Sequence, residues 1–341
     1  MKPSSLGDIV LALPALSALR RNYPEAKITW LVRPEFSQIL ENHPHLTDIV
    51  LFDRKFLGKS WYKLRAFGAF ISLIRQLRRS KFDIVIDLQG LFRTASLAWL
   101  SGCKRRFGMA NAREFAHIFY TNKISQDQTN IHLVDYYLKI IQAVGACDIG
   151  VEFVFPEDAA AGEYVSRLLQ SYGIKPHNYV VFIPGSAHVD KCWPADRFAA
   201  LADKISSEFS LPIVAAGTES EKSIVKNIAD STKATITNFA GLTNLKELVV
   251  LLKTAKFVIS NDTGPGHIAA ALGVPMVLIF GWSNPFRIAP YGRSRCIAAG
   301  GLDSRGTKIS SADPKHDVKA VTIDEVYKKV CEQFGHENSE V

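Results

Sequence analysis

The residues best suited to chemistry lie where a predicted strand turns into a predicted helix. In the segment F-V-I-S-N-D-T-G-P-G-H, an apolar run ends at Asp262, Thr263 and Gly264, and His267 follows in the first turn of the helix. The free N–H groups and positive dipole end of such a helix suit a diphosphate, and Gly264 and Gly266 would let a ligand approach the backbone. A plain turn with Asp262 or Thr263 as helix cap accounts for these residues about equally well.

Two further loops follow apolar runs of the same half. Ser186 and Lys191 lie in P-G-S-A-H-V-D-K-C-W-P, where the lysine could neutralise a phosphate leaving group, although a solvated loop lysine is the better interpretation of this loop taken alone. Glu219 and Glu221 lie in the other loop and could bind ribose hydroxyls, while the spacing of Thr218 and Glu221 equally predicts a capping box. Because open α/β sheets bind ligands at the carboxyl ends of their strands, these loops are expected at one edge.

Near the start of the chain, Asp8 ends the segment S-S-L-G-D. A carboxylate at a loop–helix junction could act as a general base, provided that a substrate hydroxyl comes within reach. Taken alone, it is better interpreted as a helix-capping aspartate. The loop is of the kind that follows a strand, yet only Met1 and Lys2 stand before Pro3. We therefore expect the first strand of this domain to be missing, either because it lies upstream or because the chain lacks it.

Basic residues are concentrated in the first half of the chain. Residues 1–155 hold 21 Lys and Arg against 13 Asp and Glu, so the formal net charge of +8 lies there and residues 156–341 are neutral. Such an excess points to an anionic partner. A group at 75–81 ends a helix and is interpreted as structural. A second group lies among aromatic residues and is interpreted as an acceptor- or surface-binding loop; it comprises Lys55, Lys59, Lys63 and Arg65.

The elements that must position these residues follow from the spacing of apolar side chains. Short runs rich in Val and Ile alternate with stretches of helical period, which predicts parallel sheets covered on both faces. The pattern occurs in each half, so we predict an α/β chain with two Rossmann-like doubly wound domains. Residues 1–155 form the first domain, 156–178 a linker helix region and 179–335 the second domain. Strands are predicted at 28–32, 49–52, 83–88, 151–155, 179–183, 212–216, 257–260 and 276–280.

Composition excludes several classes of protein. With 341 residues, 47% of them hydrophobic, the chain is no disordered segment. Its five cysteines are scattered, which argues against a disulfide framework and a structural zinc. We see no membrane span or signal peptide and expect a soluble cytoplasmic protein. The basic clusters match no nucleic-acid-binding motif, so nucleic acid is not an expected partner.

Four motifs in register resemble the ADP-heptose lipopolysaccharide heptosyltransferases of glycosyltransferase family 9. They are S-S-L-G-D at 4–8, D-x-Q-G at 87–90, D-K-x-W-P at 190–194 and D-T-G-x-x-H at 262–267. The resemblance covers nearly the whole chain and is closest to heptosyltransferase I, on segments 83–97 and 111–122. It implies a GT-B architecture, in which two Rossmann-like domains face a central cleft. It also implies inverting, metal-independent transfer of L-glycero-D-manno-heptose from ADP-heptose to a Kdo residue of Kdo2-lipid A.

The resemblance also implies partners and site residues. No cofactor is expected. The partners would be ADP-heptose, the lipopolysaccharide inner core and the cytoplasmic face of the inner membrane, and the protein itself would be a monomer. The catalytic base falls on Asp8 and the phosphate-binding lysine on Lys191. Donor binding is implied for Ser186, Lys191, Glu221, Asp262, Thr263, Gly264 and His267, and acceptor binding for Lys55, Lys59, Lys63, Arg65, Gln89 and Arg113. The alternatives are a heptosyltransferase II-type enzyme with a heptose acceptor and a non-catalytic ADP-sugar-binding protein.

Overall fold

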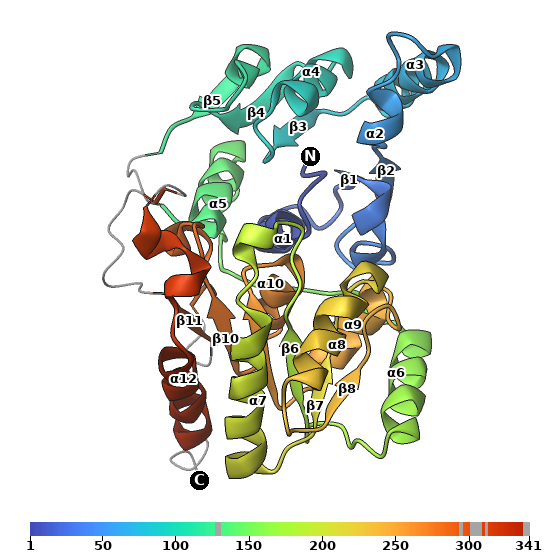
Figure 1. Cartoon of the computed structure of the whole chain (residues 1–341). Helices are drawn as coiled ribbons and strands as arrows, with labels where there is room; N and C mark the ends of the chain where they lie inside the picture. Colours follow the sequence, from blue (N-terminus) through green and yellow to red (C-terminus); the bar gives the residue numbers. More distant parts are fainter. Residues whose placement is uncertain (127–130, 293–295, 301–308, 311–312, 337–341) are drawn as a thin grey trace. The chain divides into compact units, whose positions relative to one another are not determined.

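The computed structural model describes residues 1–126, 131–292, 296–300, 309–310 and 313–336 (Figure 1). The chain divides into two compact units, Met1–Glu157 and Asp158–Val341. Each unit is an α/β structure with parallel strands.

The C-terminal unit is built on one six-stranded parallel sheet. Its strands lie in the order β11-β10-β9-β6-β7-β8, which is the strand order of a Rossmann fold. The order reverses between β6 and β9, which pair although β7 and β8 lie between them in sequence. A crevice beyond the carboxyl ends of these two strands is therefore expected to bind ligands. The strands are β6 (Val180–Ile183), β7 (Ile213–Ala215), β8 (Ile236–Asn238), β9 (Phe257–Asn261), β10 (Met276–Ile279) and β11 (Cys296–Ala299).

Helices cover both faces of this sheet. Residues of α7, α8 and α12 share one apolar cluster with the strands, including Val180 and Phe182 of β6. On the other face α10 packs against β9 and β10, α9 packs against α10, and α6 packs against α9. All four residues of β6 are at most 2% exposed, which explains its unbroken apolar sequence. The helices are α6 (Ala159–Ser171), α7 (Ala195–Phe209), α8 (Lys222–Asp230), α9 (Leu245–Lys253), α10 (Gly264–Ala271), α11 (Pro285–Ile288) and α12 (Ile323–His336).

The N-terminal unit carries two separate parallel sheets. One pairs β1 (Thr29–Val32) with β2 (Asp48–Leu51), and the other has the order β3-β4-β5, with β3 at Ile84–Asp87, β4 at Arg105–Met109 and β5 at Asn122–Ile124. The first helix, α1, packs against α5. The helices are α1 (Leu6–Asn22), α2 (Arg54–Leu57), α3 (Leu64–Arg79), α4 (Phe92–Leu100) and α5 (Leu133–Val144).

Residues Met1–Pro3 lie between the two sheets without forming a strand of their own. The Met1 amino group donates to the Ile86 carbonyl of β3 (2.6 Å), and the Arg33 N–H after β1 donates to the Pro3 carbonyl (3.2 Å). The backbone before α1 therefore bridges β1 and β3, where the sequence predicts a missing strand.

Seven of the eight predicted strands are present, each within one residue of its predicted bounds. The strand predicted at 151–155 is wrong, because this segment joins no sheet and the Val154 carbonyl instead contacts the His43 ring (3.0 Å). Sequence patterns also missed β4, β5, β8 and β11. Strand β4 begins R-R-F, which is easily taken for part of a basic cluster. Strands β5 (N-K-I) and β8 (I-T-N) are short and contain polar residues.

Candidate active site

The carboxyl ends of β6 and β9 bring two predicted site residues into direct contact. Lys191 lies in a 3-10 turn (Val189–Lys191) after β6, and Asp262 follows β9 directly. Their Nζ and Oδ2 atoms are 2.6 Å apart. The Asp262 side chain is 2% exposed and that of Lys191 is 17% exposed. Residues 71 positions apart in sequence thus form one largely buried ion pair at the switch point of the sheet.

Asp262 accepts further hydrogen bonds from groups on either side. Its Oδ2 accepts from the Ser283 hydroxyl (2.5 Å), and its Oδ1 lies 3.1 Å from Nε2 of His267. Burial alone would raise the pKa of the Asp262 carboxyl, but the hydrogen bonds and charges of His267 and Lys191 outweigh it and hold the pKa below its usual range. Asp262 is therefore an ionised carboxylate with hydrogen-bond partners at both oxygens, and it fixes the positions of Lys191 and His267.

Helix α10 begins within this cluster. Thr263 occupies the N-cap position and Gly264 is the first helical residue, so the free N–H groups of α10 lie beside the Lys191–Asp262 pair. The predicted alternative, a capping side chain, is not realised, since neither Asp262 nor Thr263 makes a side-chain cap to α10. Those N–H groups and the Lys191 ammonium together suit an anionic ligand.

The interpretation of Gly266 as a place for ligand approach is wrong. A Cβ at Gly266 would lie 2.5 Å from Leu278 Cδ1 and 2.7 Å from Ser260 Oγ, so this glycine lets α10 pack closely onto β9 and β10. This close packing positions α10, whose N-terminus lies beside the Lys191–Asp262 pair.

Sequence patterns did not identify three residues of this site. The Asn261 side-chain amide donates to the Pro184 carbonyl (2.7 Å) and its oxygen accepts from the Trp193 N–H (3.0 Å), so it ties both ends of the Lys191 loop to β9. Ser283 holds Asp262, and the Lys191 ammonium lies 5.0 Å from the centre of the Trp282 ring. Their roles depend on the pairing of β6, β9 and β10, which the spacing of residues along the chain does not reveal.

Glu221 and Ser186 lie on neighbouring loops of the same edge. Glu221 forms the predicted capping box with Thr218, accepting from its N–H (2.6 Å) and hydroxyl (2.9 Å). Its carboxylate also lies against Gly185, where a Cβ would meet Oε1 at 2.0 Å. Burial, together with the nearby Glu221 charge, raises the pKa of the Cys192 thiol. Glu221 therefore caps the turn before α8 and also reaches the Ser186 loop.

Asp8 lies in the N-terminal unit, in the first turn of α1. It is the third helical residue rather than the N-cap, and it forms a reciprocal capping box with Ser5, whose N–H (3.0 Å) and hydroxyl (3.1 Å) both donate to Oδ2. The buried Lys2 ammonium is 3.8 Å from the same oxygen. Burial lowers the pKa of Lys2, but Asp8 and Tyr137 outweigh it and raise the pKa overall. With one third of its side chain exposed, Asp8 can still meet a substrate.

Gln89 and Arg113 lie near this helix start. The Gln89 side-chain oxygen accepts from the Ser4 N–H (3.4 Å), and the Arg113 N–H donates to the carbonyl of Gly90 (3.1 Å). The preceding Asp87 is fully buried and accepts from the hydroxyls of Thr94 and Tyr120 and from the N–H groups of Gln89 and Gly90. Asp87 is thus a structural residue that holds the Gln89 turn.

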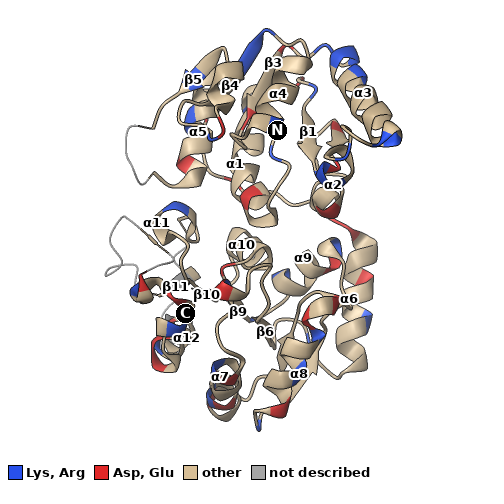
Figure 2. Cartoon of the chain, turned by 45° about the horizontal axis from the view of Figure 1, so that its top comes forward, with Lys and Arg blue, Asp and Glu red and all other residues tan. Residues whose placement is uncertain are grey.

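The remaining predicted acceptor residues lie on a basic arm, residues 54–81, which comprises α2, α3 and the turn between them. Figure 2 shows Lys and Arg along α2 and α3. The arm carries nine Lys and Arg and no Asp or Glu. Lys55, Lys59, Lys63 and Arg65 are all exposed. Part of the segment predicted as a loop is helical, because the Asp53 side chain caps α2 at the Phe56 N–H (2.9 Å).

The part of the chain that the structure describes lacks two further features. No group of three or more His, Cys, Asp and Glu there could hold a metal ion. No described helix is both long and apolar enough to cross a membrane.

Comparison with known proteins identifies the family. The model of glycosyltransferase family 9 (heptosyltransferase) matches residues 70–310. The lipopolysaccharide core heptosyltransferase OpsX of Haemophilus influenzae is 26% identical, over 85% of this chain and 80% of that protein. Lipopolysaccharide heptosyltransferase 1 of Escherichia coli is also 26% identical, over 87% of this chain and 91% of that protein.

A solved structure shows the same fold. The structure of E. coli heptosyltransferase WaaC with ADP-2-deoxy-2-fluoro heptose superposes with a TM-score of 0.73 at 24% identity, covering 99% of this chain and 98% of that one. The predicted GT-B class, with parallel sheets in two domains, is confirmed. The family match covers well over half of the chain, and this protein therefore belongs to glycosyltransferase family 9, the heptosyltransferases.

Proposed function

We propose that this enzyme transfers L-glycero-D-manno-heptose from ADP-heptose to the lipopolysaccharide inner core. The observation that carries the proposal is the Lys191–Asp262–His267 cluster at the start of α10, within a family 9 chain. The related WaaC is described with an ADP-heptose analogue, which supports the same donor here.

The C-terminal unit would bind the donor. A lysine ammonium has three N–H donors, and Asp262 engages it at one oxygen, so Lys191 can still donate to a diphosphate. The Gly264 N–H and the Ser186 loop would border the same position, and Glu221 would accept from the ribose hydroxyls. As the bond to the sugar breaks, negative charge grows on the diphosphate, and Lys191 and α10 stabilise it more in the transition state than before.

The N-terminal unit would bind the acceptor and supply the base. Asp8 would take the proton of the attacking hydroxyl, which displaces the diphosphate in one step and inverts the anomeric carbon. The buried Lys2 ammonium and the N–H and hydroxyl of Ser5 hold the Asp8 carboxylate in place. This mechanism uses no metal and no cofactor.

The anionic acceptor would meet the basic residues of this unit. Gln89 and Arg113 border the turn beside Ser4, and the basic arm would bind the acid and phosphate groups of the acceptor. We assign a Kdo residue of Kdo2-lipid A as the acceptor, on the motifs shared with heptosyltransferase I. A heptose acceptor is the competing assignment, and rates with Kdo2-lipid A and with its heptosylated product, measured side by side, distinguish the two.

The basic arm would also meet the cytoplasmic face of the inner membrane. Its exposed apolar side chains include Leu64 (90% exposed), Trp61 (85%) and Phe67 (52%). Apolar side chains surrounded by lysines and arginines are typical of segments that lie in the surface of an anionic bilayer. A monomer bound there would reach a lipid-anchored acceptor without a membrane span.

The experiment that tests the function is a transfer assay with purified enzyme, ADP-heptose and Kdo2-lipid A. Release of ADP coupled to one added heptose in the lipid, detected by mass spectrometry, is the expected result. Binding of ADP-heptose without transfer to either acceptor would refute it.

A further inference from the structure

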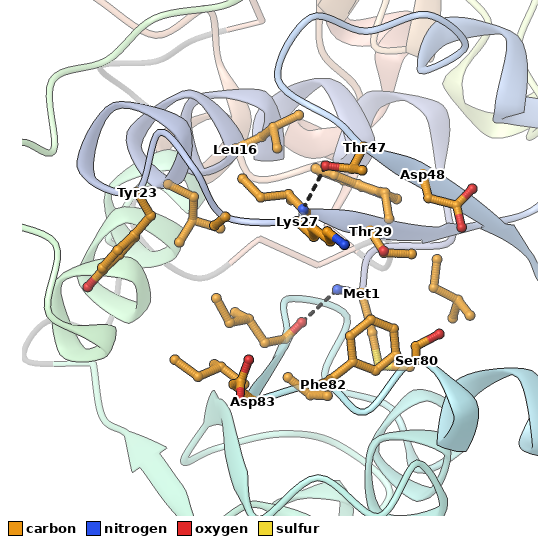
Figure 3. A pocket seen from close by; sticks show the side chains of 18 of the residues that line it. Met1, Leu16, Tyr23, Lys27, Thr29, Thr47, Asp48, Ser80, Phe82 and Asp83 are labelled. Carbon is orange, nitrogen blue, oxygen red and sulfur yellow. Dashed lines mark hydrogen bonds between the residues drawn. The ribbon is translucent and has the colours of Figure 1, made fainter.

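Four side chains in the described part of the chain bury a polar atom that has no hydrogen-bond partner. These atoms are Oγ of Ser17, Nε of Arg20, Nδ1 of His45 and Nε1 of Trp282. Because buried polar atoms are nearly always paired, each exception needs a physical reason. The first three belong to the N-terminal unit, and none of them lines the cavity of about 760 Å³ in that unit, which Figure 3 shows around Met1. The fourth, Trp282, lies in the candidate active site.

Trp282 follows β10 at the carboxyl edge of the sheet, and the residues on either side of it fix its backbone. On one side, the Ser283 hydroxyl donates to Oδ2 of Asp262 (2.5 Å). On the other side, a Cβ at Gly281 would lie 3.4 Å from the carbonyl oxygen of Asp190. The loop between β10 and α11 therefore packs against the loop that follows β6.

The indole ring of Trp282 lies against the Lys191 ammonium. Nζ of Lys191 is 5.0 Å from the centre of the ring, within the range of a cation–π interaction. The same Nζ is 2.6 Å from Oδ2 of Asp262. The ring of His188, from the Lys191 loop, is 6.2 Å from the Trp282 ring and nearly perpendicular to it. Lys191 thus contacts a carboxylate and an aromatic ring, and its side chain is only 17% exposed.

A second lysine of this unit has the same two kinds of partner at the surface. Nζ of Lys204 is 2.8 Å from Oδ1 of Asp324 and 4.9 Å from the centre of the Tyr327 ring. The side chains of Lys204 and Asp324 are 41% and 87% exposed, so water screens their attraction. The Tyr327 hydroxyl also has a partner, since it donates to Glu208. The Lys191 site differs in its burial and in its unpaired indole N–H.

Packing alone does not account for a tryptophan at position 282. A phenylalanine would place a ring there without leaving an indole N–H buried and unpaired, which costs free energy. Tryptophan, however, makes the strongest cation–π interaction of the aromatic residues. Its ring also keeps water from one side of the Lys191 ammonium, so that the charge is less screened toward an anion on the open side. The arrangement therefore favours a role of the ring toward Lys191.

We propose that Trp282 is a positioning residue for Lys191, which it holds ready for the departing diphosphate. The ring offsets the burial of the ammonium without neutralising it, as a second carboxylate would, and leaves the remaining N–H groups of Lys191 for phosphate oxygens. The inference rests on the proposed function, because it takes the donor to be ADP-heptose.

This role affects ADP more strongly than ADP-heptose. The terminal phosphate of ADP is free, so ADP carries about one more negative charge than the diphosphate within ADP-heptose. The same charge develops on the diphosphate as the bond to the sugar breaks. A residue that acts through Lys191 therefore stabilises bound ADP and the transition state more than it stabilises the bound donor.

The test compares Trp282→Leu and Trp282→Phe with wild type in the full chain. Calorimetry measures the affinities for ADP and for ADP-heptose, and a single-turnover assay with Kdo2-lipid A measures the rate of transfer. For Trp282→Leu we expect about a tenfold loss of ADP affinity and of the transfer rate, with less than about a threefold loss of ADP-heptose affinity. Trp282→Phe keeps an aromatic ring and should lose only about threefold on ADP, with ADP-heptose affinity unchanged; this variant decides the matter if the leucine variant does not fold.

The matched control is Tyr327→Leu, which removes the ring beside the exposed Lys204. It should bind both nucleotides and transfer heptose like wild type, while urea unfolding confirms that each variant is folded under the assay conditions. An equal loss of ADP and ADP-heptose affinity in the Trp282 variants would show that the indole only supports its loop. Wild-type affinities and rates in both Trp282 variants would show that it has no role in the site.

Failure of the proposed function is distinguishable from these results. Wild-type protein that binds neither nucleotide would refute the proposed donor, and this inference with it. Wild-type protein that binds both nucleotides but transfers no heptose would refute the proposed transfer alone. In that case the ratio of ADP to ADP-heptose affinity still decides whether Trp282 acts through Lys191.

Discussion

The Lys191–Asp262 pair allows a quantitative test of the site through a double-mutant cycle. The variants are Lys191→Met, Asp262→Asn and the double variant, each measured by equilibrium unfolding in urea. At 2.6 Å, two unit charges attract by about 6 kcal/mol if the effective dielectric constant is about 20. Desolvation of a 2% exposed carboxylate offsets much of this attraction. We therefore expect a coupling energy of about 2–3 kcal/mol, near the upper end for contacting residues.

A matched exposed pair provides the control for this cycle. Lys222 and Glu219 are 2.8 Å apart, but their side chains are 46% and 73% exposed. The cycle of Lys222→Met and Glu219→Gln should give a coupling energy below about 1 kcal/mol, as surface pairs do. A Lys191–Asp262 coupling no larger than that of the exposed pair would refute the claim that Asp262 is an ionised, buried anchor for Lys191.

Three further predictions concern packing, pH and the membrane. Gly266→Ala should lower the free energy of unfolding by about 1–3 kcal/mol through overpacking against Leu278. The matched Gly162→Ala in α6, where the added Cβ meets nothing within 4 Å, should raise the free energy of unfolding by up to about 1 kcal/mol. A change of the same sign in both variants would contradict the role of Gly266 in close packing. Burial holds the pKa of His43 at about 4, so neutral His43 contributes its full stabilisation of the fold above about pH 6.5. As the pH falls toward about 4, the free energy of unfolding should drop by up to about 3 kcal/mol. Urea unfolding of wild type and His43→Gln between about pH 4 and 7 checks this, and the same pH dependence of the unfolding free energy in both proteins would contradict it. The double variant Trp61→Ser/Leu64→Ser should bind vesicles containing anionic lipid at least about tenfold more weakly than wild type in a sedimentation assay. Val189→Ser alters an 83% exposed side chain outside the arm and should bind like wild type. Equal binding by wild type, the double variant and Val189→Ser would contradict a role of the arm in membrane binding.

Much of the fold could be predicted from sequence because its strands are buried on both faces. An unbroken apolar run such as V-V-F-I at β6 is typical of a strand covered on both sides, and the helices between such runs follow from their period. The strands β5 (N-K-I) and β8 (I-T-N) are short and mostly polar, so they lack the apolar run that reveals β7 (I-V-A), which is equally short. The segment 151–155 has strand-like composition but joins no sheet among the described residues.

The residues of the candidate site also differ in whether the sequence could identify them. Lys191 and Asp262 could be found because each follows a strand and precedes a helix, a context that local sequence reveals. Asn261 and Ser283 could not, because their roles arise only when β6 pairs with β9 and β10 lies beside it. Glu221 shows a third case, in which a capping residue and a ligand-facing residue have the same spacing, and the capping box observed here leaves room for both.

In the proposed mechanism, Asp8 acts on the acceptor while the Lys191 site binds the donor. The most direct measurement compares ADP-heptose affinity by calorimetry with turnover on Kdo2-lipid A, for wild type, Asp8→Asn and Lys191→Met. Asp8→Asn should bind the donor with an affinity within about twofold of wild type and lose turnover by at least about 100-fold. Lys191→Met should lose both donor affinity and turnover. Asp8→Asn with wild-type turnover, or Lys191→Met with wild-type donor affinity and turnover, would contradict the account.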